Sequence, residues 1–157
     1  MSKERFAALL GPVIQAVTRM DLSKADAVDE LAHQFPIESP GLKELATLFE
    51  AGVAEGWLCG REANGVRYSR FKKASSPLDV SIDAVRMDQP GPGHTHPNGE
   101  VDVCFPVRGD PRFDGRPAGW TVYPPGSWHV PTVTGGLMNI LYFLPGGAIT
   151  FEPKPEG

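Results

Sequence analysis

Two histidines and a glutamate lie close together in one short segment, residues 93–100, which reads G-H-T-H-P-N-G-E. Imidazole nitrogens bind divalent transition metals well, and a carboxylate adds an oxygen ligand and negative charge. His94 and His96 are two residues apart, so in an extended segment their side chains point to the same face. Glu100 keeps that parity, although a proline and a glycine interrupt the intervening chain. The segment therefore predicts most of a metal site.

A second segment, residues 124–129, reads P-P-G-S-W-H and supplies a third imidazole. The two segments together predict a metal centre with four ligands: His94, His96, Glu100 and His129. This set suits Zn, Fe, Mn or Ni and does not identify the metal. The alternative is a polar pocket in which hydrogen bonds satisfy the histidines without a metal. The fourth histidine, His33, falls on a predicted helix, where we expect it to be exposed.

The first 56 residues predict three helices that would help to position this site. Apolar residues recur at helical spacing in two stripes, at Phe6, Leu9, Leu10, Val13, Ile14 and Val17 and at Ala27, Val28, Leu31 and Phe35. Ser39-Pro40 is typical of the start of a third helix, and Gly56 of its end. We expect these helices to pack on the rest of the chain, as a lid or as a dimerisation element.

From Trp57 the pattern changes to the alternation that is typical of strands. Asn64-Gly65 between two such runs is a strong hairpin signal. The predicted strands are 57–62, 66–72, 78–87, 100–107, 119–123, 129–133, 137–144 and 148–151. We therefore predict a mainly β fold preceded by about three N-terminal α-helices, with residues 1–56 packed on residues 57–157 as one structural unit.

Composition narrows the class of protein. A chain of 157 residues fits one domain, and its net charge of −4 with no basic block argues against a nucleic-acid partner. No apolar run is long enough to span a membrane, and the N-terminus lacks the features of a signal peptide. We expect a cytoplasmic protein with no membrane partner. Cys59 and Cys104 are then expected to be buried thiols rather than a disulfide.

The two metal-site segments resemble the two motifs of the cupin superfamily. H-x-H-x(3)-E and P-x-G-x-x-H are matched by residues 94–100 and 124–129, whereas the glycine-containing lead-in at 89–93 matches loosely. Val133 stands where the superfamily usually has an asparagine, which is not a ligand. The resemblance implies a cupin-type double-stranded β-helix, a small barrel with the metal inside.

Within such a barrel, strand parity identifies further inward positions. With Glu100 inward, Asp102 and Cys104 of the same strand face the cavity, and Val101 and Val103 pack behind. An inward carboxyl two residues from a ligand can act as a general acid or base or hydrogen-bond a ligating histidine. Alternatively, Asp102 is turned to solvent at the end of the strand.

The chain as a whole resembles a narrower family over about residues 40–152. E-G-W-L-C at 55–59, N-G-V-R-Y at 64–68, F-D-G at 113–115 and I-L-Y-F-L-P-G-G-A-I at 140–149 look like the 4-hydroxylaminobenzoate lyase family. That resemblance implies conversion of 4-hydroxylaminobenzoate to 3,4-dihydroxybenzoate (protocatechuate) with release of ammonia, as part of nitrobenzoate catabolism. The partner would then be a small aromatic carboxylate.

This chemistry implies roles for several residues. Glu100 and Asp102 are the candidate acids that would protonate a leaving group. A carboxylate favours an arginine fork, for which Arg67 and Arg70, and also Arg86, lie on predicted strands. An aromatic ring needs an apolar slot, and the candidate aromatic side chains are Tyr123, Trp128 and Tyr142, with Trp120 and Phe143 nearby in the sequence.

Two other functions fit the same ligands. One is a non-haem iron cupin dioxygenase acting on a small aromatic or thiol substrate, which would need oxygen. The other is a non-catalytic, metal-bearing module that binds a small molecule. The cupin resemblance also implies a homodimer.

Overall fold

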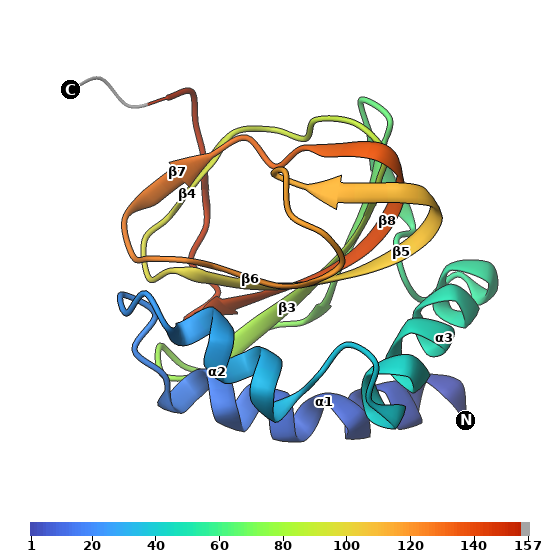
Figure 1. The fold of residues 1–157 in the computed structure, drawn as a ribbon, viewed down its shortest axis with the longest axis horizontal. Coiled ribbons are helices and arrows are strands. Elements are labelled where there is room, and N and C mark those ends of the chain that lie inside the picture. The colour runs from blue at the N-terminus through green and yellow to red at the C-terminus, as the bar shows by residue number, and fades with distance from the viewer. Residues whose placement is uncertain (155–157) are drawn as a thin grey trace.

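The computed structural model describes residues 1–154 and begins with three helices, α1 (Ser2–Arg19), α2 (Ala27–Gln34) and α3 (Pro40–Glu55). They follow the predicted apolar stripes, whose buried members include Phe6, Leu10, Leu31 and Phe49. Gly56 ends α3 in the left-handed conformation, with φ of 89°, which glycine adopts without a steric penalty. Figure 1 shows the helices gathered on one side of the molecule.

The strands form two sheets. They are β1 (Arg61–Ala63), β2 (Val66–Lys72), β3 (Val80–Met87), β4 (His94–His96), β5 (Glu100–Phe113), β6 (Gly119–Tyr123), β7 (Ser127–His129), β8 (Val133–Pro145) and β9 (Thr150–Phe151). A six-stranded sheet has the order β1-β2-β3-β8-β5-β6, and a three-stranded sheet has the order β7-β4-β9. All the named pairings are antiparallel.

The prediction of a mainly β fold with three preceding helices is confirmed, but the barrel is not closed by strand pairing. Within residues 1–154, β1 and β6 are the two edges of the larger sheet. The proline- and glycine-rich segment 89–93 ends β3, because proline has no N–H to continue a ladder. The chain then passes to β4, which pairs with β7 and β9 instead (Figure 1).

Several predicted strands are wrong at their ends, and two of the differences have a clear local cause. Residues 57–60 are not in a strand, because Trp57 and Leu58 donate their N–H groups to the carbonyl oxygen of Gly52 and so complete the end of α3. The predicted strand 129–133 is divided: His129 ends β7 and Val133 begins β8. Pro131 lies in the gap and cannot donate to a sheet ladder.

The larger sheet is buried on both faces. One face packs against the helices through Ile82, Ala84, Val101, Val103, Leu141 and Phe143. The other face carries Val85, Met87, Cys104, Met138, Ile140, Tyr142 and Leu144. Because side chains alternate along a strand, Glu100 and Asp102 share the second face with Cys104. This second face, called the site face below, is the side of the sheet turned away from the helices.

Neither cysteine is part of a disulfide or a candidate nucleophile. Both are buried free thiols. Burial raises the pKa of Cys59 to about 12, and burial followed by the Asp102 carboxyl raises the pKa of Cys104 well above its ordinary value. Since the thiolate is the reactive form, neither group reacts readily at neutral pH. No helix in residues 1–154 has the length and apolar character that crossing a membrane requires.

We propose that the helices and the sheet unfold as one unit, and Phe6 tests this. Its fully buried ring makes edge contacts with Phe49, Trp57 and Phe71, at centroid distances of 6.4, 5.4 and 5.1 Å. Phe6→Ala is expected to lower the free energy of unfolding by about 3–5 kcal/mol, in a single urea transition followed by tryptophan fluorescence and circular dichroism. Exposed Lys3→Ala is the control on the same helix. Separate transitions for the two probes would contradict the proposal.

Candidate metal centre

Short strand pairings bring the four predicted ligands together. In the three-stranded sheet, His94 lies opposite His129 and His96 lies opposite Ser127. Glu100 is the first residue of β5, reached from His96 by a short turn. The four residues offer ligand atoms that all lie within 4.8 Å of one another, and three of the four are buried.

The distances between these atoms fit a single ion. Glu100 Oε1 is 3.2 Å from His94 Nε2 and 3.3 Å from His96 Nε2. His129 Nε2 is 3.2 Å from His94 Nε2 and 3.6 Å from Glu100 Oε2. Two ligand atoms that are each about 2.1 Å from one metal lie about 3.0–3.4 Å apart at tetrahedral or octahedral angles. The set is therefore close to the spacing that coordination requires.

Hydrogen bonds at the other ring nitrogen orient each imidazole. His94 Nδ1 lies 3.2 Å from the carbonyl oxygen of Pro92, and His129 Nδ1 lies 2.7 Å from Asp114 Oδ2. His96 Nδ1 lies 2.9 Å from Ser127 Oγ, whose hydroxyl donates to the Pro124 carbonyl and so accepts from the ring. All three Nδ1 atoms then carry the proton, and the three Nε2 lone pairs point to one place.

Two ligand atoms have no other partner. His96 Nε2 and Glu100 Oε2 are buried without a hydrogen bond from any residue in 1–154. Leaving a buried polar atom unpaired costs about 1–3 kcal/mol, and a cation would satisfy both atoms at once. Together with the nitrogen and oxygen donor set, this shows that the residues fit a divalent transition metal.

Glu100 and Asp102 are neighbouring buried carboxyl groups whose pKa values are shifted in opposite directions. Burial opposes the charge on Glu100, but the His129, His94 and His96 rings that surround its carboxylate hold its pKa well below its ordinary value. Burial, and then the Glu100 charge, raise the pKa of Asp102 well above its ordinary value. Both Asp102 carboxyl oxygens lack a partner among residues 1–154. The two shifts favour the charged form of Glu100 and the protonated form of Asp102.

A row of polar side chains extends from Asp102 across the site face. Asp102 lies opposite Thr121 on β6 and Tyr142 on β8. Tyr142 in turn lies opposite Asp83 on β3, and Asp83 lies opposite Arg70 on β2. The Tyr142 ring centroid is 6.2 Å from that of His94. The register thereby brings together three of the sequence-predicted residues, Asp102, Tyr142 and Arg70.

Two of the three guanidinium nitrogens of Arg70 are hydrogen-bonded to Asp83. Its Nε and Nη2 atoms bind the two Asp83 oxygens at 2.7 and 3.1 Å. The remaining nitrogen, Nη1, has no hydrogen-bond partner among residues 1–154 and lies beside Gly147, where a Cβ would come within 3.6 Å of it. This nitrogen is available to an anionic group.

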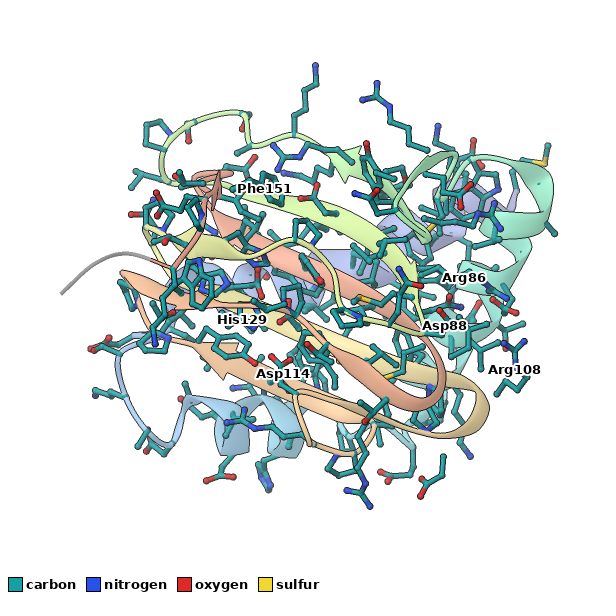
Figure 2. The ribbon with its side chains drawn as sticks, turned by 90° about the horizontal axis from the view of Figure 1, so that it is seen from above. Arg86, Asp88, Arg108, Asp114, His129 and Phe151 are labelled. Carbon is teal, nitrogen blue, oxygen red and sulfur yellow. The ribbon has the colours of Figure 1, made fainter. Side chains whose placement is uncertain are left out.

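The other predicted arginines lie elsewhere. Arg67 lies opposite Arg86 in the sheet. Arg86 pairs with Glu50 of α3 and with Asn139, on the face that carries the helices. Figure 2 shows Arg86 at the opposite end of the molecule from His129. The structure therefore does not bring Arg67 or Arg86 to the centre.

The two predicted aromatic residues near His129 have different placements. Tyr123 stacks on His96, with centroids 5.3 Å apart and an interplanar angle of 23°. Trp128 alternates with Ser127 and His129 on β7, so it points to the opposite side of the small sheet. Its indole Nε1 donates to the Glu152 carbonyl at 2.9 Å. Tyr123 borders the ligands and Trp128 does not.

Sequence reasoning missed two residues that support the ligands, Asp114 and Ser127. Ser127 lies within a motif that was noticed only for His129. Asp114 is followed by Gly115 in a hairpin turn. Because Asp-Gly is a common turn sequence, the turn alone accounts for the presence of this aspartate in the sequence. The alternation of β7 places Ser127 on the same side as His129, and this was the available signal.

Comparisons with known proteins agree with these observations. A family model described as PnbB, 4-hydroxylaminobenzoate lyase, matches residues 9–151. A protein of Pseudomonas putida named 4-hydroxylaminobenzoate lyase is 30% identical over 170 residues, covering 95% of this chain and 97% of that protein. A protein of the same name from Nocardioides sp. (strain LMS-CY) is 34% identical over 124 residues, covering 72% and 73%.

Among solved structures, an RmlC-like cupin protein from Ralstonia eutropha JMP134 is 16% identical, with a TM-score of 0.42, and covers 54% of this chain and 58% of that protein. The family model spans nearly the whole chain, including all four predicted ligands. The chain therefore belongs to the 4-hydroxylaminobenzoate lyase family and is a lyase.

Proposed function

We propose that this protein converts 4-hydroxylaminobenzoate to 3,4-dihydroxybenzoate and ammonia at a metal centre formed by His94, His96, Glu100 and His129. The observation that carries the proposal is that three Nε2 atoms converge near the buried Asp102 carboxyl, which has no hydrogen-bond partner in the part of the chain that the structure describes. Family membership supplies the substrate. The site offers four residues that would hold a cation, and a buried carboxyl group beside them.

The reaction balances without an external oxidant. The N–O bond breaks and its oxygen leaves as water, and the C–N bond breaks later with release of ammonia. Two waters supply the two hydroxyl oxygens of the product, so that one water is consumed overall. The nitrogen is reduced to the level of ammonia while the neighbouring ring carbon is oxidised. The protein must therefore supply a proton where the oxygen leaves.

Asp102 is the residue placed to supply that proton. A divalent metal held by His94, His96, Glu100 and His129 would supply Lewis acidity beside Asp102. Glu100 keeps its charge and serves as a ligand, whereas Asp102 keeps its proton in the same buried environment. Asp102 thus donates to the departing oxygen, and the burial of the site excludes competing water from the acid.

The row from Asp102 to Arg70 supports an orientation for the substrate. In a para-substituted benzoate, the reacting nitrogen and the carboxylate lie at opposite ends of the ring. β2 lies three strand spacings from β5, about 14 Å. The length of the substrate and the length of the arginine side chain together can span this separation. We assign the ring to the row between Asp102 and Arg70, beside Tyr142 of β8, and the carboxylate to Arg70 Nη1.

Arg70→Ala is expected to raise KM for 4-hydroxylaminobenzoate by about 10- to 100-fold, because a charge-assisted hydrogen bond contributes about 1.5–3 kcal/mol. The change should leave kcat within a few-fold, since Arg70 does not contact the reacting nitrogen. Arg67→Ala, on the same strand, is the matched control and should leave KM unchanged. Thermal unfolding of each variant separates lost binding from the lost Asp83 ion pair. An unchanged KM in folded Arg70→Ala would remove Arg70 from the site.

The proposed function is tested directly with metal-loaded protein and 4-hydroxylaminobenzoate. Equal amounts of 3,4-dihydroxybenzoate and ammonium are expected, measured by chromatography and an enzymatic ammonium assay. Substrate loss without ammonium would indicate another reaction. Binding without any turnover, across hydroxylamino-, nitro- and hydroxybenzoates, would indicate a small-molecule binding module.

A further inference from the structure

Asp114 occupies a tight turn between β5 and β6. Phe113 and Arg116 exchange backbone hydrogen bonds of 2.8 and 2.9 Å, which leaves Asp114 and Gly115 as a two-residue loop. Their φ angles are 51° and 81°. Turns with two positive φ angles favour Asn, Asp and Gly, so the backbone alone would accept Asn at this position equally well. The turn does not explain why the residue is charged.

The Asp114 carboxylate joins three separate segments. Its Oδ1 accepts from the Thr132 backbone N–H at 2.8 Å. Its Oδ2 accepts from the Tyr123 hydroxyl and from His129 Nδ1, the latter at 2.7 Å. Figure 2 shows Asp114 near His129 and well away from Arg86. Two donors other than the imidazole, the Tyr123 hydroxyl and the Thr132 N–H, therefore hold the carboxylate in place.

The three imidazoles differ in what their Nδ1 atoms contact. For His94 and His96 the acceptor is neutral, a backbone carbonyl and a hydroxyl. For His129 it is a carboxylate. His129 is also the most exposed of the three, with 11% of its side chain accessible against 1% and 0%. The ligand with the least packing around it thus has the strongest and most constrained hydrogen-bond partner.

We propose that Asp114 is the positioning residue that holds His129 as a metal ligand, and that Tyr123 in turn orients Asp114. A fixed carboxylate at Nδ1 keeps the proton there, presents the Nε2 lone pair to the metal and makes the imidazole more electron-donating. The inference rests on the metal centre proposed above. It adds that the affinity of this centre depends on a residue that never touches the ion.

The test compares metal affinity in Asp114→Asn and wild type, with Zn²⁺ and Co²⁺ as the ions and a chromophoric chelator as competitor. Asn suits the same turn and keeps a carbonyl oxygen, so the variant is expected to fold. Loss of the charge should weaken binding by about 10- to 100-fold. The visible absorption bands of bound Co²⁺ should also shift, which a purely structural role of Asp114 would not cause. Tyr123→Phe keeps the ring stacked on His96 and should weaken binding by a smaller factor, about 3- to 10-fold.

Asn64→Asp is the matched control, because Asn64-Gly65 is another turn in which a polar residue and a glycine both have positive φ angles, 52° and 84°. That turn joins β1 to β2, at the edge of the sheet away from β5. The control should bind metal as wild type does. Wild-type affinity and an unchanged Co²⁺ spectrum in both Asp114→Asn and Tyr123→Phe would overturn the inference. Absence of binding in wild type would instead overturn the metal centre itself, and this inference with it.

Discussion

His96→Ala is expected to remove most of the bound metal and to lower kcat/KM by about a thousandfold or more, since Lewis-acid stabilisation is worth several kcal/mol. His96 is fully buried and its Nε2 atom has no hydrogen-bond partner within the described residues 1–154, so its loss removes a ligand from the centre. Elemental analysis of the purified variant and steady-state assays measure the two effects. Both effects should appear in the same protein.

His33→Ala is the matched control for this experiment. His33 is an exposed residue on α2, far in sequence from the ligands, and its loss removes an imidazole without touching the centre. It should keep full metal content and activity. A His96→Ala protein that retains both would show that the buried histidine cluster is a polar pocket rather than a metal site.

Asp102→Asn is expected to lower kcat by about 10²- to 10⁴-fold, the usual contribution of a general acid. Metal affinity should change little, because Asp102 makes no hydrogen bond to the three histidines. Asn has the shape of a protonated Asp, so the variant should fold without leaving a buried charge. Asp110→Asn, an exposed substitution on the same strand, is the control.

The outcome of Asp102→Asn separates two roles for the carboxyl. Loss of turnover with retained metal supports the acid role. Loss of metal and turnover together would mean that Asp102 supports the ligands instead, and an unchanged kcat would remove it from the reaction. The third possibility raised by the sequence, a solvent-facing Asp102, is already contradicted, because the residue is completely buried.

The ligands could be predicted from sequence because they depend on local spacing. His94 and His96 sit on one short strand and Glu100 opens the next, so alternation fixes their relative directions. The same alternation carried the prediction from Glu100 to Asp102. The helices were also readable, because their apolar stripes and the Gly56 terminus are local features.

Features that depend on register between distant strands could not be read. Arg67 and Arg70 both lie on β2, and only the pairing with β3 shows that Arg70 joins the row containing Asp102. The support of His129 by Asp114 crosses from one hairpin to another strand. The open edges of the larger sheet could not be predicted either. The proline-rich segment 89–93 predicts a turn, and a turn is compatible both with a chain that stays in one sheet and with a chain that passes to another.

The central claim is that this metal centre performs a lyase reaction that needs no oxygen. The most direct measurement is ammonium release from 4-hydroxylaminobenzoate by metal-loaded protein under strictly anaerobic conditions. One ammonium per substrate consumed is expected, at the same rate as in air. Turnover that stops without oxygen would contradict it and would instead indicate a non-haem dioxygenase using the same four ligands.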